Sequence, residues 1–190
     1  MISDLTGGSR SGTQTTEQTA GVKQQFLRVH LVPDTTALLP VYQMTEVLTM
    51  GISEIVPIPH MPAWVIGVYN WRGEILWMVD LGHLLGLTPL YQAISRSTYT
   101  AVVVNSAQQV SLQQPSSQTT GRKMLGLVVN RVEDMELCNP NWIQSPPQSA
   151  VGSELVPFLS GYWLKSNGEI LVVLDGHSII AGMPQPEATF

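Results

Sequence analysis

One segment occurs twice in this chain, and this repeat constrains the fold more than any other feature. The run Gly73-Glu-Ile-Leu-Trp-Met-Val-Asp80 aligns with Gly168-Glu-Ile-Leu-Val-Val-Leu-Asp175 at a constant offset, since 168 − 73 = 95 and 175 − 80 = 95. Each copy follows an apolar run that contains a glycine, Gly67 or Gly161. A solenoid needs at least about three units, so the duplication instead predicts two related β subdomains, at approximately 26–81 and 99–174.

Short apolar runs predict that the ordered part of the chain is mostly β. They alternate or are continuously apolar, and Gly, Pro, Asn and Asp separate them, which is typical of strands and turns. The runs are 26–32, 35–41, 45–50, 65–70, 74–79, 99–105, 124–129, 132–137, 159–165 and 169–174. Strands of this length and spacing are typical of sandwiches and barrels, so we expect an all-β protein.

Helical signals are few. Asp80 and Asp175 each precede a short apolar run that ends at a glycine, Gly86 or Gly182. An aspartate N-cap followed by a glycine stop predicts a short helix in both places. Two further short helices are expected at 41–44 and 62–65.

Three segments are expected to lie outside the folded part. Residues 1–24 and 106–123 are rich in Ser, Thr, Gly and Gln and poor in large apolar residues. Such segments cannot offset the entropy lost on ordering, so we predict a disordered N-terminal tail and a long flexible connection. With residues 183–190 as a C-terminal tail, one folded domain remains at 25–182.

Composition and charge restrict the functions that the chain can have. Charged residues make up 12% of the sequence, against roughly 25% in an average soluble domain. Either partners cover part of the apolar surface, or Gln, Ser and Thr replace the charges. The net charge of −5 and the lack of any Lys/Arg-rich run argue against nucleic-acid binding.

The same survey predicts a cytoplasmic protein with no direct membrane insertion. No apolar run approaches the roughly 18 residues that a membrane-spanning helix needs. The N-terminus shows no secretory signal, and the single cysteine, Cys138, cannot form an intramolecular disulfide.

Comparison of the two repeat copies separates fold from function. Shared residues are expected to serve the fold: Gly73 and Gly168 for tight turns, Ile75 and Ile170 for strand cores. The second turn contains Asn167-Gly168, a standard hairpin dipeptide, whereas the first carries Trp71 and Arg72 in its place. Trp and Arg are enriched at interaction hot spots. Alternatively, Arg72 pairs with a nearby carboxylate and Trp71 caps the barrel.

The region around this turn resembles the signature of CheW-like chemotaxis coupling proteins. The run from Met61 to Leu81 contains Pro, an aromatic residue, Gly, the motif Asn-x-Arg-Gly and a β run that closes in Asp-Leu. The resemblance extends from Phe26 to about Ile180. It implies two intertwined five-stranded SH3-like β-barrels with a few short helices.

The resemblance also implies a function. Family members are non-catalytic adaptors that couple the cytoplasmic tips of methyl-accepting-type receptors to a CheA-like histidine kinase, in chemotaxis, phototaxis or type IV pilus motility. By residue match, Asn70, Arg72 and Gly73 are expected on the receptor-binding side. Glu46 and Met44 are expected to flank the same groove. Trp71 stands where the family has a small aliphatic residue, and we include it in the candidate receptor-binding site.

The kinase-binding residues are not predicted individually. We expect an apolar, open strand edge or barrel end of one subdomain to meet the kinase.

The other groups of polar residues do not indicate a catalytic or metal-binding site. The four histidines have no metal-ligand spacing, and the N-cap context explains Asp80 and Asp175. The acidic group Glu133, Asp134 and Glu136 is expected to be a solvated face. We therefore expect no enzyme activity, catalytic residue, metal or cofactor. The alternative function is a small-molecule-binding or hydrolytic β-barrel protein, which would need a concave pocket with convergent polar groups.

Overall fold

The computed structural model describes residues 22–93, 96–106, 123–145 and 152–183. The predicted tails and the predicted flexible connection fall almost wholly outside these ranges. Among the described residues, no helix is long and apolar enough to cross a membrane.

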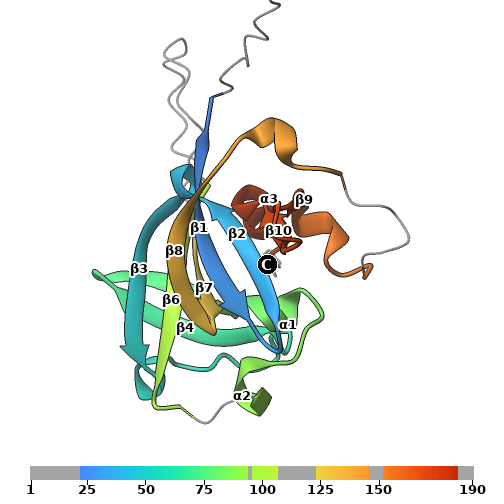
Figure 1. Cartoon of the computed structure of the whole chain (residues 1–190). Coiled ribbons are helices and arrows are strands. Elements are labelled where there is room, and N and C mark those ends of the chain that lie inside the picture. The colour runs from blue at the N-terminus through green and yellow to red at the C-terminus, as the bar shows by residue number, and fades with distance from the viewer. Residues whose placement is uncertain (1–21, 94–95, 107–122, 146–151, 184–190) are drawn as a thin grey trace, which may run out of the picture.

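The described part of the chain forms ten strands, and the all-β prediction is confirmed (Figure 1). Every predicted strand is present, with bounds that differ by at most two residues. The strands are β1 (Gln24–Leu31), β2 (Thr35–Pro40), β3 (Met44–Gly51), β4 (Val65–Trp71), β5 (Glu74–Asp80), β6 (Thr98–Asn105), β7 (Met124–Val129), β8 (Arg131–Cys138), β9 (Leu159–Leu164) and β10 (Ile170–Leu174).

Short helices connect the strands. They are α1 (Leu81–Leu84), α2 (Leu90–Ala93) and α3 (Gly176–Ala181), with 3-10 helices η1 (Val41–Gln43), η2 (Ile52–Glu54), η3 (Pro140–Trp142) and η4 (Val156–Phe158). The Asp80 carboxylate accepts a hydrogen bond from the His83 backbone N–H at 3.1 Å, which confirms the predicted N-cap of α1. Asp175 caps α3 by accepting a hydrogen bond from the His177 backbone N–H, two residues on, at 3.1 Å.

The prediction of a short helix at 62–65 is wrong. Here the Val65 N–H bonds the Pro62 carbonyl across a single turn, and β4 begins at once. Proline is tolerated in the first turn of a helix, but it is also common in turns, including one that precedes a strand.

The ten strands form two five-stranded sheets, each of which combines both repeats. Barrel 1 has the order β8-β1-β2-β10-β9, and barrel 2 has the order β3-β6-β7-β5-β4. Each barrel therefore combines the first two strands of one repeat with the last three strands of the other repeat. This exchange confirms the predicted intertwining. It also means that segments 26–81 and 99–174 are repeats in sequence but not separate bodies.

The register shows that the exchange is symmetric. In barrel 1, β10 pairs with β2 in parallel, and in barrel 2, β5 pairs with β7 in parallel. The repeat-equivalent glycines Gly67 and Gly161 lie where another segment crosses closely. A Cβ atom at Gly67 would lie 2.3 Å from the Val56 carbonyl oxygen, and one at Gly161 would lie 2.5 Å from that of Gln144. Only glycine fits such an approach, which explains why both copies have it.

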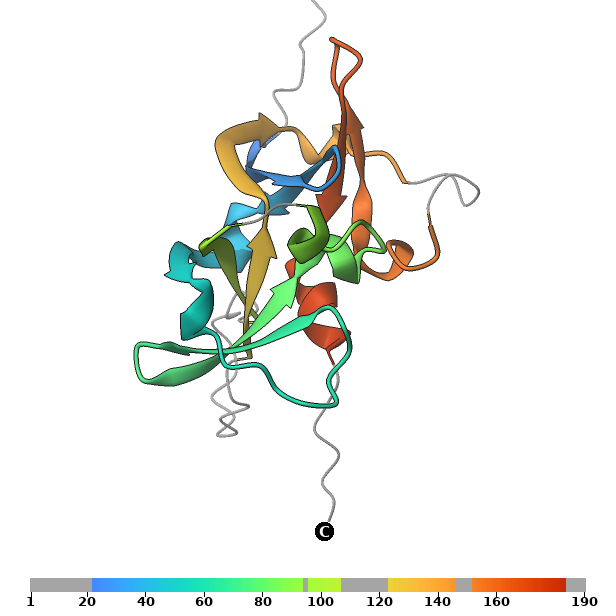
Figure 2. The ribbon, with the colours of Figure 1, turned by 90° about the horizontal axis from the view of Figure 1, so that it is seen from below.

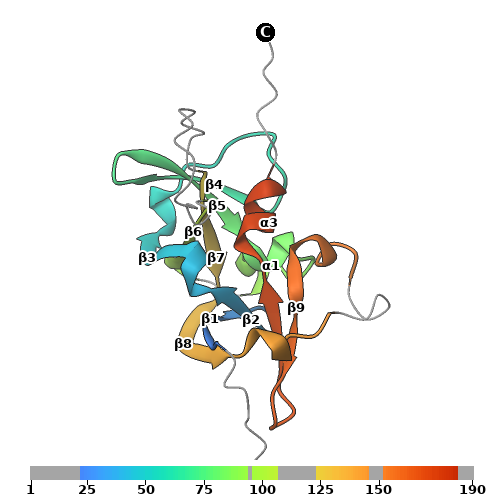
Figure 3. The same ribbon diagram turned by 90° about the horizontal axis from the view of Figure 1, so that it is seen from above.

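Buried apolar side chains form three clusters. One fills barrel 2 around Met78, Ala101 and Val103, and a smaller one fills barrel 1 around Phe26 and Leu171. The largest lies between the barrels and takes residues from both. Figure 3 shows the two barrels side by side, with α1 and α3 beside their junction.

Candidate functional site: the Asn70–Gly73 turn and Glu46

The predicted Asn70–Gly73 motif forms the tip of the β4–β5 hairpin. Arg72 and Gly73 have positive φ angles of 54° and 86°, as expected for consecutive residues of a type I′ turn. The Asn70 side-chain oxygen accepts a hydrogen bond from the Gly73 N–H at 3.0 Å. The prediction of positive φ at Gly73 and Gly168 is confirmed, since Gly168 has a φ of 84°.

Glu46 on β3 receives both neighbouring side chains of the turn. The Trp71 indole N–H donates to Glu46 Oε1, and the Arg72 guanidinium donates to Glu46 Oε2 at 2.8 Å. The guanidinium carbon also lies 4.9 Å from the centre of the Trp71 ring, within the range of a cation–π interaction. Because β3 and β4 are the two edge strands of barrel 2, these contacts help to close the barrel.

The two side chains differ in what they offer to a partner. Trp71 is 9% exposed and packs in the interior of barrel 2. The Arg72 side chain is 68% exposed, although it is tied to Glu46. Both contacts of the alternative interpretation are thus present, since Trp71 caps the barrel and Arg72 pairs with a carboxylate. The group that remains exposed is the Arg72 guanidinium, whose position is fixed by Glu46 and by the Trp71 ring.

Met44 does not join this cluster. It begins β3, and its partly buried side chain packs against the core between the barrels. The register of β3 against β6 shifts between Met44 and Glu46, which marks a bulge there. The structure therefore unites Asn70, Trp71, Arg72, Gly73 and Glu46, with Met44 nearby along the same strand.

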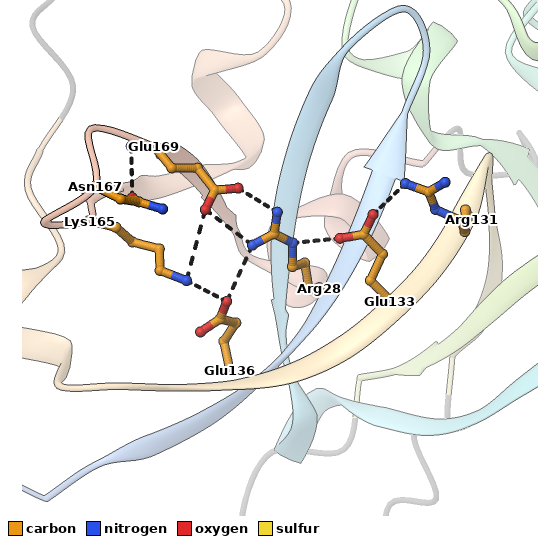
Figure 4. Close-up of polar contacts among 7 residues, drawn as sticks. All are labelled: Arg28, Arg131, Glu133, Glu136, Lys165, Asn167 and Glu169. Carbon is orange, nitrogen blue, oxygen red and sulfur yellow. Dashed lines mark hydrogen bonds and ion pairs between the residues drawn. The ribbon is translucent and has the colours of Figure 1, made fainter.

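Barrel 1 has a different cluster at the equivalent place, and sequence reasoning missed it (Figure 4). Arg28 on β1 donates from Nε to Glu133 at 2.6 Å, from Nη1 to Glu136 at 3.3 Å, and from Nη2 to Glu169. Lys165 pairs with Glu136 at 2.7 Å. The expectation of a solvated acidic face is wrong for Glu133 and Glu136, since both pair with cations that lie far away in the sequence.

These ion pairs shift the pKa values of the cluster. Hydrogen bonds from Arg131 and Arg28 outweigh desolvation and lower the pKa of Glu133. A hydrogen bond from Arg28 does the same to the pKa of Glu169. The carboxylates in turn raise the pKa of Arg28 above its ordinary value. All three side chains are therefore charged at neutral pH.

A second missed residue lies where the chain passes from barrel 1 to barrel 2. Gln43 is buried between β2 of barrel 1 and β3 of barrel 2. Its amide nitrogen donates to Asp175 at 2.8 Å, and its amide oxygen accepts from the Gly176 N–H at 2.7 Å. Burial alone would raise the pKa of Asp175, but hydrogen bonds from Ser178, Gln43 and His177 outweigh it and lower that pKa.

The remaining candidates have structural settings. Cys138 is buried in barrel 1 and its thiol contacts the Asn139 carbonyl at 3.3 Å; burial raises its pKa. Within the described ranges, no three His, Cys, Asp or Glu side chains come together as a metal site would require.

The fold and the site together define a class: double-barrel β proteins in which two repeats exchange strands and one hairpin tip presents a fixed arginine. The chain belongs to the family of CheW-like domains, whose family model matches residues 25–182. The resemblance read from the sequence is thereby confirmed.

Individual relatives agree with this assignment. The chain is 25% identical to the chemotaxis protein CheW of Treponema pallidum over 162 residues, which cover 79% of this chain and 85% of the relative. It is 32% identical to a probable chemotaxis protein CheW of Rhizobium etli over 98 residues, about half of each chain (52% and 52%).

A solved structure shows the same fold. The crystal structure of the scaffolding protein TtCheW from Thermoanaerobacter tengcongensis superposes with a TM-score of 0.64 at 19% sequence identity. The match covers 85% of this chain and 94% of that chain.

Proposed function

We propose that this protein is a non-catalytic adaptor of chemotaxis-type signalling. It couples the cytoplasmic tips of methyl-accepting-type receptors to a CheA-like histidine kinase, and it works in the cytoplasm at membrane receptor arrays. Chemotaxis, phototaxis and type IV pilus motility are the outputs that such a coupling would serve. The observation that carries the proposal is the exposed Arg72 guanidinium, which Glu46 and Trp71 hold in place in one repeat only. Family membership and the CheW relatives support it.

The turn suits the recognition of a helical receptor tip. An arginine that is already oriented loses little side-chain entropy on binding, and its remaining N–H groups can donate to carboxylates or carbonyl oxygens of a helix. Asn70 and Gly73 set the shape of the turn, and Glu46 sets the direction of the guanidinium. Met44 supplies an apolar flank for such a helix.

Exposed apolar side chains are the candidates for the kinase contact. Met135 and Leu137 are exposed on β8, an edge strand of barrel 1. An open, apolar strand edge can pair with or pack against a similar barrel of a partner. This surface lies on the barrel that lacks the Arg72 turn, so receptor and kinase would bind at different places.

A hydrolytic function has no comparable support. The cleft beside α1 has His83 and Glu154 among its lining residues, but none of the described residues that line it is a Ser, Thr, Cys or Lys. Acid–base groups without a nucleophile do not define a hydrolytic site.

The receptor assignment can be tested with Arg72→Glu. The change reverses the exposed charge and places it beside Glu46, so binding to a receptor-tip fragment should weaken at least about tenfold. Kinase binding should be retained and the far-UV circular dichroism spectrum unchanged. Pull-down assays with receptor tips and kinases from the same organism would measure both.

A matched control is available in barrel 1. Arg131 is 63% exposed and also pairs with a single glutamate, Glu133, so Arg131→Glu makes the same change elsewhere. This variant should bind receptor tips normally. Full receptor binding by Arg72→Glu would remove Arg72 from the site, and binding of the native protein to neither partner would reject the adaptor function.

A further inference from the structure

A cleft of about 650 Å³ opens beside α1 and η4. We term it the α1–η4 cleft; its lining includes Trp64, His83, Gly86, Leu87, Glu154 and Phe158. Trp64 directly precedes β4, whereas the Asn70–Gly73 turn lies at the other end of that strand. Trp64 and Asn70 are six positions apart along the strand, roughly 20 Å, so the cleft is distinct from the Arg72 site.

The two aromatic residues of the cleft occupy equivalent positions in the two repeats. The Trp64 carbonyl accepts a hydrogen bond from the Asp80 N–H at 2.9 Å, and the Phe158 carbonyl accepts one from the Asp175 N–H, also at 2.9 Å. Both residues thus stand just before the glycine-containing strand, in register with the capping aspartate. The cleft therefore lies where the two repeats meet. Figure 3 shows the ribbons of α1 and α3 next to each other in this region.

Glu154 breaks this symmetry and gives the cleft its charge. Its side chain is exposed, and within the described ranges it has no hydrogen bond or ion pair. None of the described residues that line the cleft is a lysine or an arginine. Gly86 has a φ of 76°, and a Cβ atom there would lie 2.5 Å from Glu154 Oε2. A side chain at position 86 would displace the carboxylate, so the glycine leaves room for the carboxylate there.

His83 adds a second unpaired polar group. Its Nδ1 atom is shielded from solvent and has no hydrogen-bond partner among the described residues. A buried polar atom without a partner costs free energy. The cleft thus combines aromatic surface with one free carboxylate, and His83, one of its lining residues, carries the shielded nitrogen.

We infer that the α1–η4 cleft binds a small organic cation, an ammonium or guanidinium group carried on an apolar or aromatic body. Aromatic rings attract cations through their quadrupole, and a carboxylate supplies the opposite charge. A volume of about 650 Å³ matches a whole small molecule rather than one protein side chain. The inference does not depend on the proposed adaptor function, because the two sites share no residue.

Three indole compounds that differ in charge test the inference on the full chain. They are tryptamine, which is cationic, tryptophol, which is neutral, and indole-3-acetate, which is anionic. Isothermal titration calorimetry should show that tryptamine binds about tenfold more tightly than tryptophol, and that indole-3-acetate binds most weakly. The indole N–H resonance of Trp64 should shift as tryptamine is added.

Glu154→Gln should lower the affinity for tryptamine about tenfold, to the level of tryptophol, and leave tryptophol binding unchanged. Asp134→Asn, which removes an exposed carboxylate from β8, is the matched control and should leave both affinities unchanged. Equal affinities of the native protein and Glu154→Gln for tryptamine, or an unshifted Trp64 resonance, would overturn the inference. Tighter binding of acetyl-lysine amide than of tryptamine would also overturn it, in favour of a protein side chain as the occupant.

Discussion

Arg72 adopts a backbone conformation that arginine disfavours. Its φ of 54° lies in the left-handed region, which costs a residue with a Cβ atom roughly 1 kcal/mol or more. The repeat copy has Asn167 at the equivalent position, and asparagine tolerates this region well. Strain of this kind is concentrated at functional sites, so the turn is better suited to presenting a guanidinium than to stabilising the hairpin.

Replacement of Arg72 by Asn should separate these two roles. Arg72→Asn creates the Asn-Gly dipeptide of the other hairpin and relieves the backbone, while it removes an exposed ion pair worth at most about 1 kcal/mol. The free energy of unfolding should therefore stay within about 1 kcal/mol of the native value, or rise. Receptor binding should still fall. Chemical denaturation and a receptor pull-down would measure the two effects, and a large loss of stability would show that Arg72 serves the fold.

Sequence reasoning found this turn but not its partner atoms. The repeat shows that Trp71 and Arg72 are unique to one copy, which singles them out. It cannot show that Glu46 bonds both, because that contact depends on how the two edges of barrel 2 meet. The Arg28 cluster was missed for the same reason, since its carboxylates come from strands that lie far from β1 in the sequence.

At the scale of elements, periodicity predicted every strand, but it did not predict correctly which side chains of each strand are buried. Alternation and turn residues are local signals, so strand bounds could be read from the chain. Ile75 and Ile170 were expected in strand cores because both repeats share them, and this is wrong: they are 68% and 61% exposed. Both lie at the start of the second strand of a hairpin, next to its turn. Figure 2 shows the tips of these two hairpins projecting from the body.

The charged cluster of β1, β8 and the β9–β10 hairpin should make stability depend on acid. Since the pKa values of Glu133 and Glu169 are lowered in the fold, their stabilising effect is present above the unfolded value of about 4.3. It is lost as the pH falls below that value and through the lowered pKa. Arg28→Met removes the central cation, so the loss of stability on acidification should be smaller than in the native protein.

At neutral pH the same variant should be less stable by about 1–3 kcal/mol, because three carboxylates lose a shared partner that is only partly exposed. Urea denaturation at a series of pH values from about 3 to 7 would measure both effects. Parallel stability curves for the native protein and Arg28→Met would show that the cluster does not couple protonation to folding.

The whole molecule is held together by the exchange of strands between repeats. Neither repeat can complete a barrel, because each supplies two strands to one barrel and three to the other. Where the chain crosses from one barrel to the other, Gln43 bonds the crossing segment to the start of α3. The parallel pairings β2–β10 and β5–β7 could not be read from the sequence, since local periodicity fixes the face of a strand but not its neighbour.

Splitting the chain between the repeats should test this interdependence. A fragment of residues 1–94 and one of residues 95–190 should each lack the near-ultraviolet circular dichroism of packed aromatic residues. Refolded together, they should recover it, because the missing strands are supplied in trans. A fragment with native-like signal and a cooperative unfolding transition on its own would contradict the exchange as the source of stability.

The exchange of strands also decides how many copies of each surface the protein has. Two repeats that swap strands have the topology of a domain-swapped dimer joined into one chain, with an approximate two-fold axis between them. Any surface away from the axis exists twice, and the two versions can diverge, as the Arg72 turn and the Asn167 turn have done. A surface at the axis, such as the cleft between Trp64 and Phe158, exists once. The symmetry of the molecule thus fixes its number of binding surfaces. It has two related but non-identical copies of each surface away from the axis, and one copy of each surface at the axis.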